Sequence, residues 1–141
     1  MILRGHLLIE ELLDQLIAAH LKYPKAINDA RLTFFQKLCI AQGMIGRSNE
    51  DFTWIPIKKL NELRNSISHN LPDDRFSERL DSVLKAFFEN EFDEIPKDIY
   101  SKSKALRKGI IFHCAHLYGF REGIRAARSR KSQLGKSLTE G

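Results

Sequence analysis

The stretch from Leu106 to Ala127, LRKGIIFHCAHLYGFREGIRAA, is the most regular part of the sequence. Its apolar and aromatic side chains alternate by four and three positions, which is the spacing of a helix that packs along its neighbours. The members of this series are Leu106, Ile110, His113, Leu117, Phe120, Ile124 and Ala127. Three glycines within the stretch, Gly109, Gly119 and Gly123, lower helix propensity but would let another helix approach closely. The stretch therefore predicts a long final helix that packs against the rest of the molecule.

Four earlier segments also have helical periodicity, and prolines mark their boundaries. We expect helices over about residues 2–22, 29–44, 56–71 and 73–90. The core-facing residues expected are Leu8, Leu12, Leu16 and Ala19, with Ile9, Leu13 and Ile17 beside them, in the first helix; Leu32, Phe35, Leu38 and Cys39 in the second; Leu60, Leu63 and Ile67 in the third; and Phe76, Leu80, Val83, Leu84 and Phe87 in the fourth. Residues 91–101 are expected to form a loop, with Ser101 capping the final helix.

These segments predict an all-α fold, an up-and-down bundle of four long helices and one shorter helix. A chain of 141 residues fits one domain with a single core. We place this helical domain at residues 1–128. Residues 129–141 are rich in Ser, Gly and Lys, and they predict a basic, disordered tail.

The composition favours a cytoplasmic protein. No apolar run approaches the roughly 20 residues that cross a bilayer, so we expect no membrane partner. Acidic residues interrupt the N-terminal apolar block, which therefore does not resemble a signal peptide. Cys39 and Cys114 lie in apolar helical stretches and predict two buried free thiols rather than a disulfide.

Positive charge is concentrated near the C-terminus. Residues 102–136 contain ten Lys or Arg and one acid, Glu122, for a net charge of +9, whereas the whole chain carries +5 and the remainder therefore −4. Such a separation points to a polyanionic or acidic partner for the C-terminal part of the chain. The alternative is a solvated helix face followed by a basic tail.

The third predicted helix carries an unusual polar face. On a helix, Leu60, Leu63 and Ile67 cluster toward the core. An adjacent arc of roughly 140° holds two amides, a guanidinium, a hydroxyl and an imidazole. These side chains belong to Asn61, Arg64, Asn65, Ser68 and His69. Ordinary solvent-facing helix surfaces are rich in Lys and Glu instead, so this face is expected to bind a ligand.

The chemistry of this face suits a phosphodiester. Arg64 offers a planar, charged fork of donors that matches phosphate oxygens. His69 has an ordinary pKa near neutrality, so it can give or take a proton. RNA supplies its own nucleophile, the 2′-hydroxyl, so cleavage needs no metal or other cofactor. On a straight helix Arg64 and His69 lie about 140° apart. Either the helix distorts before Pro72, or a second copy of the helix supplies the complement in a two-fold dimer.

The pattern Arg64-Asn65-x-x-x-His69 in a small helical bundle resembles the HEPN superfamily, the higher eukaryotes and prokaryotes nucleotide-binding domains. Residues 60–63, LNEL, and residues 8–14, LIEELLD, are also similar to its members, so the resemblance covers about residues 3–90. It implies a homodimeric, metal-independent endoribonuclease that leaves 2′,3′-cyclic phosphate ends and serves as a toxin or a phage-defence component. It gives His69 the role of general acid and base, Arg64 that of stabilising the phosphorane, and Asn65 a supporting role. Ser68 departs from the pattern, because relatives often have a small apolar residue there.

Other interpretations stay open. Arg64 and His69 would also fit a polar network that closes the end of the third helix. The superfamily includes members that do not cleave RNA, such as relatives of the mannitol operon repressor, so a regulatory or interaction module is the alternative function.

Several other polar residues have structural or supporting interpretations. His6 and His20 are expected to be packed histidines of the first helix. His113 and His116 with Cys114 suggest a metal site, but no further ligands are spaced to complete it, so we expect no metal. Glu10 or Glu11 would orient the Arg64 guanidinium if either reaches it from the first helix.

Overall fold

The computed structural model describes the backbone of residues 1–45, 53–68, 73–88 and 95–139. Within these ranges the chain forms six helices and no strand, which confirms the predicted all-α fold. The helices are α1 (Ile2–His20), α2 (Lys25–Asn28), α3 (Phe34–Ile45), α4 (Ile55–Ser68), α5 (Asp73–Phe87) and α6 (Ile99–Thr139). In the part of the chain described, no helix is both long and apolar enough to span a membrane.

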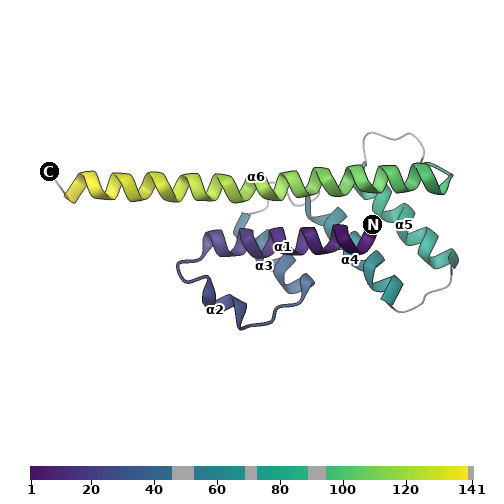
Figure 1. The fold of residues 1–141 in the computed structure, drawn as a ribbon, viewed down its shortest axis with the longest axis horizontal. Helices are drawn as coiled ribbons and strands as arrows, with labels where there is room; N and C mark the ends of the chain where they lie inside the picture. Colours follow the sequence, from purple (N-terminus) through teal and green to yellow (C-terminus); the bar gives the residue numbers. More distant parts are fainter. Residues whose placement is uncertain (46–52, 69–72, 89–94, 140–141) are drawn as a thin grey trace.

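Helix α6 runs along the full length of the molecule, and α1 lies beside it (Figure 1). The two helices run in the same direction. Near their starts, Ser103 Oγ donates to Met1 Sδ at 3.8 Å. Near the end of α1, Arg128 Nη1 donates to the carbonyl oxygens of Ala19 at 2.7 Å and Leu21 at 3.0 Å. Arg128 thus satisfies carbonyls that the end of α1 leaves without helical partners.

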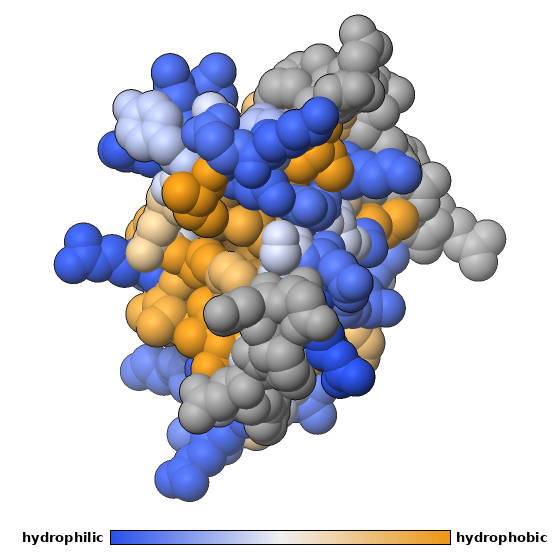
Figure 2. All heavy atoms as spheres, turned by 90° about the vertical axis from the view of Figure 1, so that its right-hand side faces the viewer, coloured by the Kyte–Doolittle hydropathy of each residue, from blue (hydrophilic) through white to orange (hydrophobic). Residues whose placement is uncertain are grey.

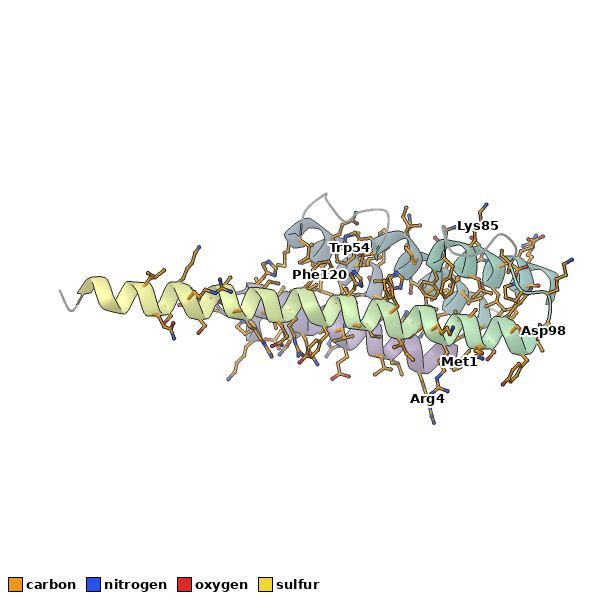
Figure 3. The ribbon with its side chains drawn as sticks, turned by 90° about the horizontal axis from the view of Figure 1, so that it is seen from above. Met1, Arg4, Trp54, Lys85, Asp98 and Phe120 are labelled. Carbon is orange, nitrogen blue, oxygen red and sulfur yellow. The ribbon has the colours of Figure 1, made fainter. Side chains whose placement is uncertain are left out.

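The remaining long helices pack on the other sides of α1 and α6. Helix α3 packs on α1, α4 packs on both α1 and α5, and α5 reaches back to α6. Lys102 on α6 forms an ion pair with Asp81 on α5 at 2.6 Å. Trp54, just before α4, is buried and stacks with Phe120 of α6 at 6.4 Å between ring centroids (Figure 3). This stacking fixes the start of α4 against α6, as expected for an aromatic anchor.

The core confirms most of the predicted apolar faces. Its buried members include Ile9, Leu13, Leu16 and Ile17 of α1; Leu60 and Leu63 of α4; Leu80, Val83, Leu84 and Phe87 of α5; and Leu106, Ile110 and Leu117 of α6. On α1 and α4, two predicted core residues are exposed instead, Leu8 at 54% and Ile67 at 37%. The buried side of α1 is centred on the Ile9 and Leu13 positions, because α6 covers one flank and α3 and α4 cover the other. Ile67 lies in the last turn of α4.

The prediction of a second helix over residues 29–44 was wrong about where the helix starts and about which side of it faces the core. Instead of one helix over 29–44, a short α2 is followed by a turn in which Arg31 has a φ of 46°, and α3 then begins at Phe34. Thr33 and Gln36 form a capping box, with Gln36 N donating to Thr33 Oγ1 and Thr33 N donating to Gln36 Oε1.

The capped start of α3 also sets which of its residues are buried. Phe34, Leu38 and Ala41 face the core, whereas Leu32 is half-buried outside the helix and Phe35 is half exposed. Cys39 is exposed and Cys114 is half-buried, so the prediction of two buried thiols was wrong for Cys39. Both thiols are free, and burial raises the pKa of Cys114.

Helix α6 differs from its prediction at both ends. Asp98, not Ser101, caps its start, because Asp98 Oδ1 accepts from Ser101 N at 2.8 Å (Figure 3). This hydrogen bond lowers the pKa of the Asp98 carboxyl. At the other end the helix continues to Thr139, through residues predicted to form a disordered tail. No proline interrupts residues 129–139.

Of the three glycines predicted to allow a close approach, Gly109, Gly119 and Gly123, only Gly109 meets a neighbour closely among the described residues. A Cβ on Gly109 would overlap the ring of Phe87 on α5, so this glycine allows the close approach that the sequence predicted. Gly119 and Gly123 have nothing within 4 Å of such a Cβ among the described residues. The sequence did not predict a second close approach, which lies between α1 and α6, where Gly5 packs against the Ile110 side chain.

Candidate functional site

Arg64 and Asn65 are half-buried on α4, at a pocket of about 290 Å³. Arg64 Nη1 donates to Asn65 Oδ1 at 3.1 Å. The pocket is lined by residues of α1, the start of α3, and α4: His6, Glu10, Thr33, Phe34, Phe35, Asn61, Arg64 and Asn65. Three members of the predicted polar face, Asn61, Arg64 and Asn65, therefore meet at one opening.

Ser68, the fourth member of that face, does not line this pocket. Ser68 is exposed at the last residue of α4. His69, predicted as the general acid and base, lies outside the described residues. Its role stays a prediction.

His6 is the pocket residue whose contacts sequence reasoning missed. It was expected to be a packed histidine, and it is indeed buried, with 4% of its surface exposed. Its ring also stacks on Phe34 at 4.1 Å between centroids, and its Nε2 lies 3.0 Å from Asn61 Oδ1. An amide oxygen only accepts, so His6 Nε2 carries the proton in this bond. His6 and Asn61 are 55 positions apart, and no local sequence pattern joins them.

The environment of His6 favours its neutral form. Burial lowers the pKa of His6 from its ordinary value of 6.5, and the nearby charge of Arg64 lowers it further. The bond to Asn61 and the charge of Glu10 act in the opposite direction without restoring the pKa. A neutral imidazole with its proton on Nε2 holds the Asn61 amide in one orientation.

The hydrogen bonds leave the pocket rich in donors. Asn61 Oδ1 accepts from His6, and Asn65 Oδ1 accepts from Arg64. The amide NH₂ groups of both asparagines, together with the guanidinium, are then donors that a ligand can meet in this pocket. The pocket therefore suits a ligand that offers acceptor oxygens, and a phosphate is such a ligand.

Glu10 is the carboxylate among the residues that line this pocket, and it has a cationic partner. Lys37 Nζ lies 3.0 Å from Glu10 Oε1 and 2.8 Å from Asp14 Oδ2, joining α3 to α1. Glu10 thus reaches the Arg64 pocket, as was considered from the sequence, but its ion pair is with Lys37. Glu11 is exposed and accepts a hydrogen bond from Gln15.

The basic C-terminal segment has both internal and surface members. Lys102 pairs with Asp81, while Arg121 contacts Gln15 and pairs with Glu122. The exposed members include Lys104, Arg107, Lys108, Arg130 and Lys131. Part of the charge excess therefore joins α6 to its neighbours, and part lies on its surface.

His113 of α6 is a packed residue of the core. His113 is buried, and its Nδ1 donates to the carbonyl oxygen of Gly109 at 2.8 Å. Its ring lies 4.8 Å from that of Phe87. Among the described residues, no three His, Cys, Asp or Glu side chains gather as they would around a metal ion.

Comparisons with protein-family models, with curated proteins and with solved structures found no match to this chain.

Proposed function

We propose that this protein is a metal-independent endoribonuclease of the HEPN type, acting as a cytoplasmic homodimer in a toxin or phage-defence role. The observation that carries the proposal is the donor-rich pocket in which Arg64 meets Asn65 and Asn61. A guanidinium and two amide groups at one half-buried opening match the oxygens of a phosphodiester. The neutral His6 supports this pocket by fixing Asn61.

In the proposed reaction, the RNA 2′-hydroxyl attacks the adjacent phosphorus, and the 5′-oxygen of the next nucleotide leaves. As general base and acid, His69 takes the proton from the 2′-hydroxyl and gives a proton to the leaving 5′-oxygen, so no net proton is gained or lost. Arg64 binds the phosphate oxygens and stabilises the charge that develops on them, and Asn65 holds the guanidinium. The products are a 2′,3′-cyclic phosphate and a 5′-hydroxyl.

The proposed site combines Arg64 of one subunit with His69 of the other. Helix α4 is continuous from Ile55 to Ser68, and His69 lies outside the described residues. A continuation of the same helix to residue 69 would put the two positions about 140° apart. A two-fold axis beside α4 would let the two copies complete each other's sites. The exposed basic residues of α6 would then bind RNA backbone or an acidic antitoxin.

The test is RNA cleavage by the purified protein in the presence of EDTA. Wild type is expected to produce 2′,3′-cyclic phosphate ends, and R64A and H69A are each expected to lower the rate at least about a hundredfold. Arg4, an exposed arginine on α1 that does not line the pocket, supplies the matched control, and R4A should cleave at close to the wild-type rate. A folded wild-type protein that cleaves no RNA, or R64A and H69A variants as active as wild type, would refute the enzyme.

The alternative function, an interaction module without catalysis, is favoured by exposed apolar side chains. These include Leu3, Leu7 and Leu8 of α1 and Ile99, Tyr100 and Ile111 of α6. Figure 2 shows apolar surface at the end of the molecule where α1 and α6 begin. Contiguous apolar surface of this kind often marks a protein contact. The absence of cleavage in the EDTA assay, combined with a stable dimer, would favour this module.

A further inference from the structure

A second pocket adjoins the first along the junction of α3 and α4. It has a volume of about 250 Å³ and is lined by Phe35, Leu38, Cys39, Gln42, Trp54, Ile55 and Lys58. Phe35 lines both pockets. We call the two pockets together the α3–α4 groove, in which Phe35 separates a polar part with Arg64 from a more apolar part with Trp54.

The Phe35 ring lies at the surface of the groove rather than in the core. Its neighbour Phe34 is buried, whereas Phe35 is 49% exposed. The capping box at Thr33 and Gln36 fixes the first turn of α3. The orientation of the helix about its axis, and with it the exposure of Phe35, is therefore set where the helix starts. A half-exposed aromatic ring in a groove is a surface on which an unpaired base stacks.

The charge of the groove favours an anionic strand. Lys58 Nζ lies over the Phe35 ring, 5.9 Å from its centroid, and Arg64 lines the polar part. Glu10 is paired with Lys37, and in the part of the chain described no carboxylate lines the second pocket. Lys58 and Arg64, six positions apart on α4, lie about 9 Å apart along the helix axis. Two cations therefore accompany the ring along the groove.

We infer that the α3–α4 groove binds single-stranded RNA, with one base stacked on Phe35 beside the phosphate held by Arg64. This inference rests on the proposed function and names its substrate as unpaired RNA. Paired bases are already stacked within a duplex and cannot lie on the Phe35 ring. The groove thus selects single-stranded segments for the site on α4.

The inference is tested with a short fluorescein-labelled RNA whose riboses are 2′-O-methylated, so that it lacks the nucleophile and stays intact. Fluorescence anisotropy measures its affinity for the wild-type protein and for variants. F35A should bind the single strand about tenfold more weakly, because a stacked base is lost. F35W, which keeps an aromatic face, should bind within about twofold of wild type. F112A is the matched control, since Phe112 is 42% exposed on α6 and lines neither pocket, and it should bind like wild type.

A duplex of the same sequence should bind more weakly than the single strand. Equal binding by F35A and wild type, equal binding of duplex and single strand, or no binding of either RNA would overturn the inference. Its failure differs from failure of the proposed enzyme. If F35A cleaves RNA as fast as wild type, the groove inference is refuted and the proposed enzyme is not. If binding depends on Phe35 but no RNA is cleaved, the proposed enzyme is refuted and the groove inference is not.

Discussion

At the scale of single residues, the pocket depends on how the polar groups are paired. Arg64 and Asn65 were predicted as site residues from their spacing on one helix, and the structure places both at the same opening. His6 was predicted only as a packed residue, because its contact with Asn61 joins two helices that are distant in the sequence. Local periodicity shows which side of a helix is polar, but it does not show which residue of another helix meets it.

The buried His6 makes stability depend on pH. Its folded pKa lies below the unfolded value of 6.5, so the unfolded chain binds more protons between these two values. The stability contributed by neutral His6 is therefore present above about pH 6.5 and is lost as the pH falls toward the folded pKa. We expect the free energy of unfolding of wild type to fall more steeply between pH 7 and pH 5 than that of H6Q, which keeps a polar amide but cannot titrate.

Urea unfolding at several pH values measures this difference. The other histidines are common to both proteins, so their effect cancels in the comparison. Parallel pH profiles for wild type and H6Q would show that His6 is not held neutral by its surroundings.

At the scale of elements, turns and caps were harder to predict than periodic helices. The long apolar series of α6 and the faces of α4 and α5 could be read directly from spacing. The break before α3 was missed, although Thr33 and Gln36 have the spacing of a capping box. Because the start of α3 was missed, Phe35 was predicted to face the core, whereas Phe34 does. Adjacent positions on a helix point about 100° apart, so the two side chains face different sides.

The glycines of α6 give a test within one helix. G109A should lower the free energy of unfolding by about 2 kcal/mol, because the new methyl group overlaps the buried ring of Phe87. G119A should raise it by about 0.5 kcal/mol, because the site is open and alanine is the better helix former. Chemical unfolding of both variants beside wild type measures the two changes. Equal effects at the two positions would contradict the close packing of α5 on α6.

At the scale of the whole molecule, α6 extends well past the bundle (Figure 1). Its 41 residues span about 60 Å, whereas the 19 residues of α1 span about 28 Å. The sequence predicted a tail here because its composition is polar and contains glycine. Composition alone does not separate a solvated helix from a disordered segment. The fold class was predictable because it follows from periodicity along the entire chain, while the dimer stays a prediction.

The proposed sharing of Arg64 and His69 between two subunits can be tested directly with a mixed dimer. R64A and H69A chains carrying different tags can be co-expressed, and the heterodimer can be isolated by purification on both tags in turn. If each site takes Arg64 from one subunit and His69 from the other, the heterodimer retains one intact site of two. It should then cleave RNA in EDTA at about half the wild-type rate, while each variant homodimer is inactive. A heterodimer as inactive as the two homodimers, beside an active wild type, would contradict the shared site.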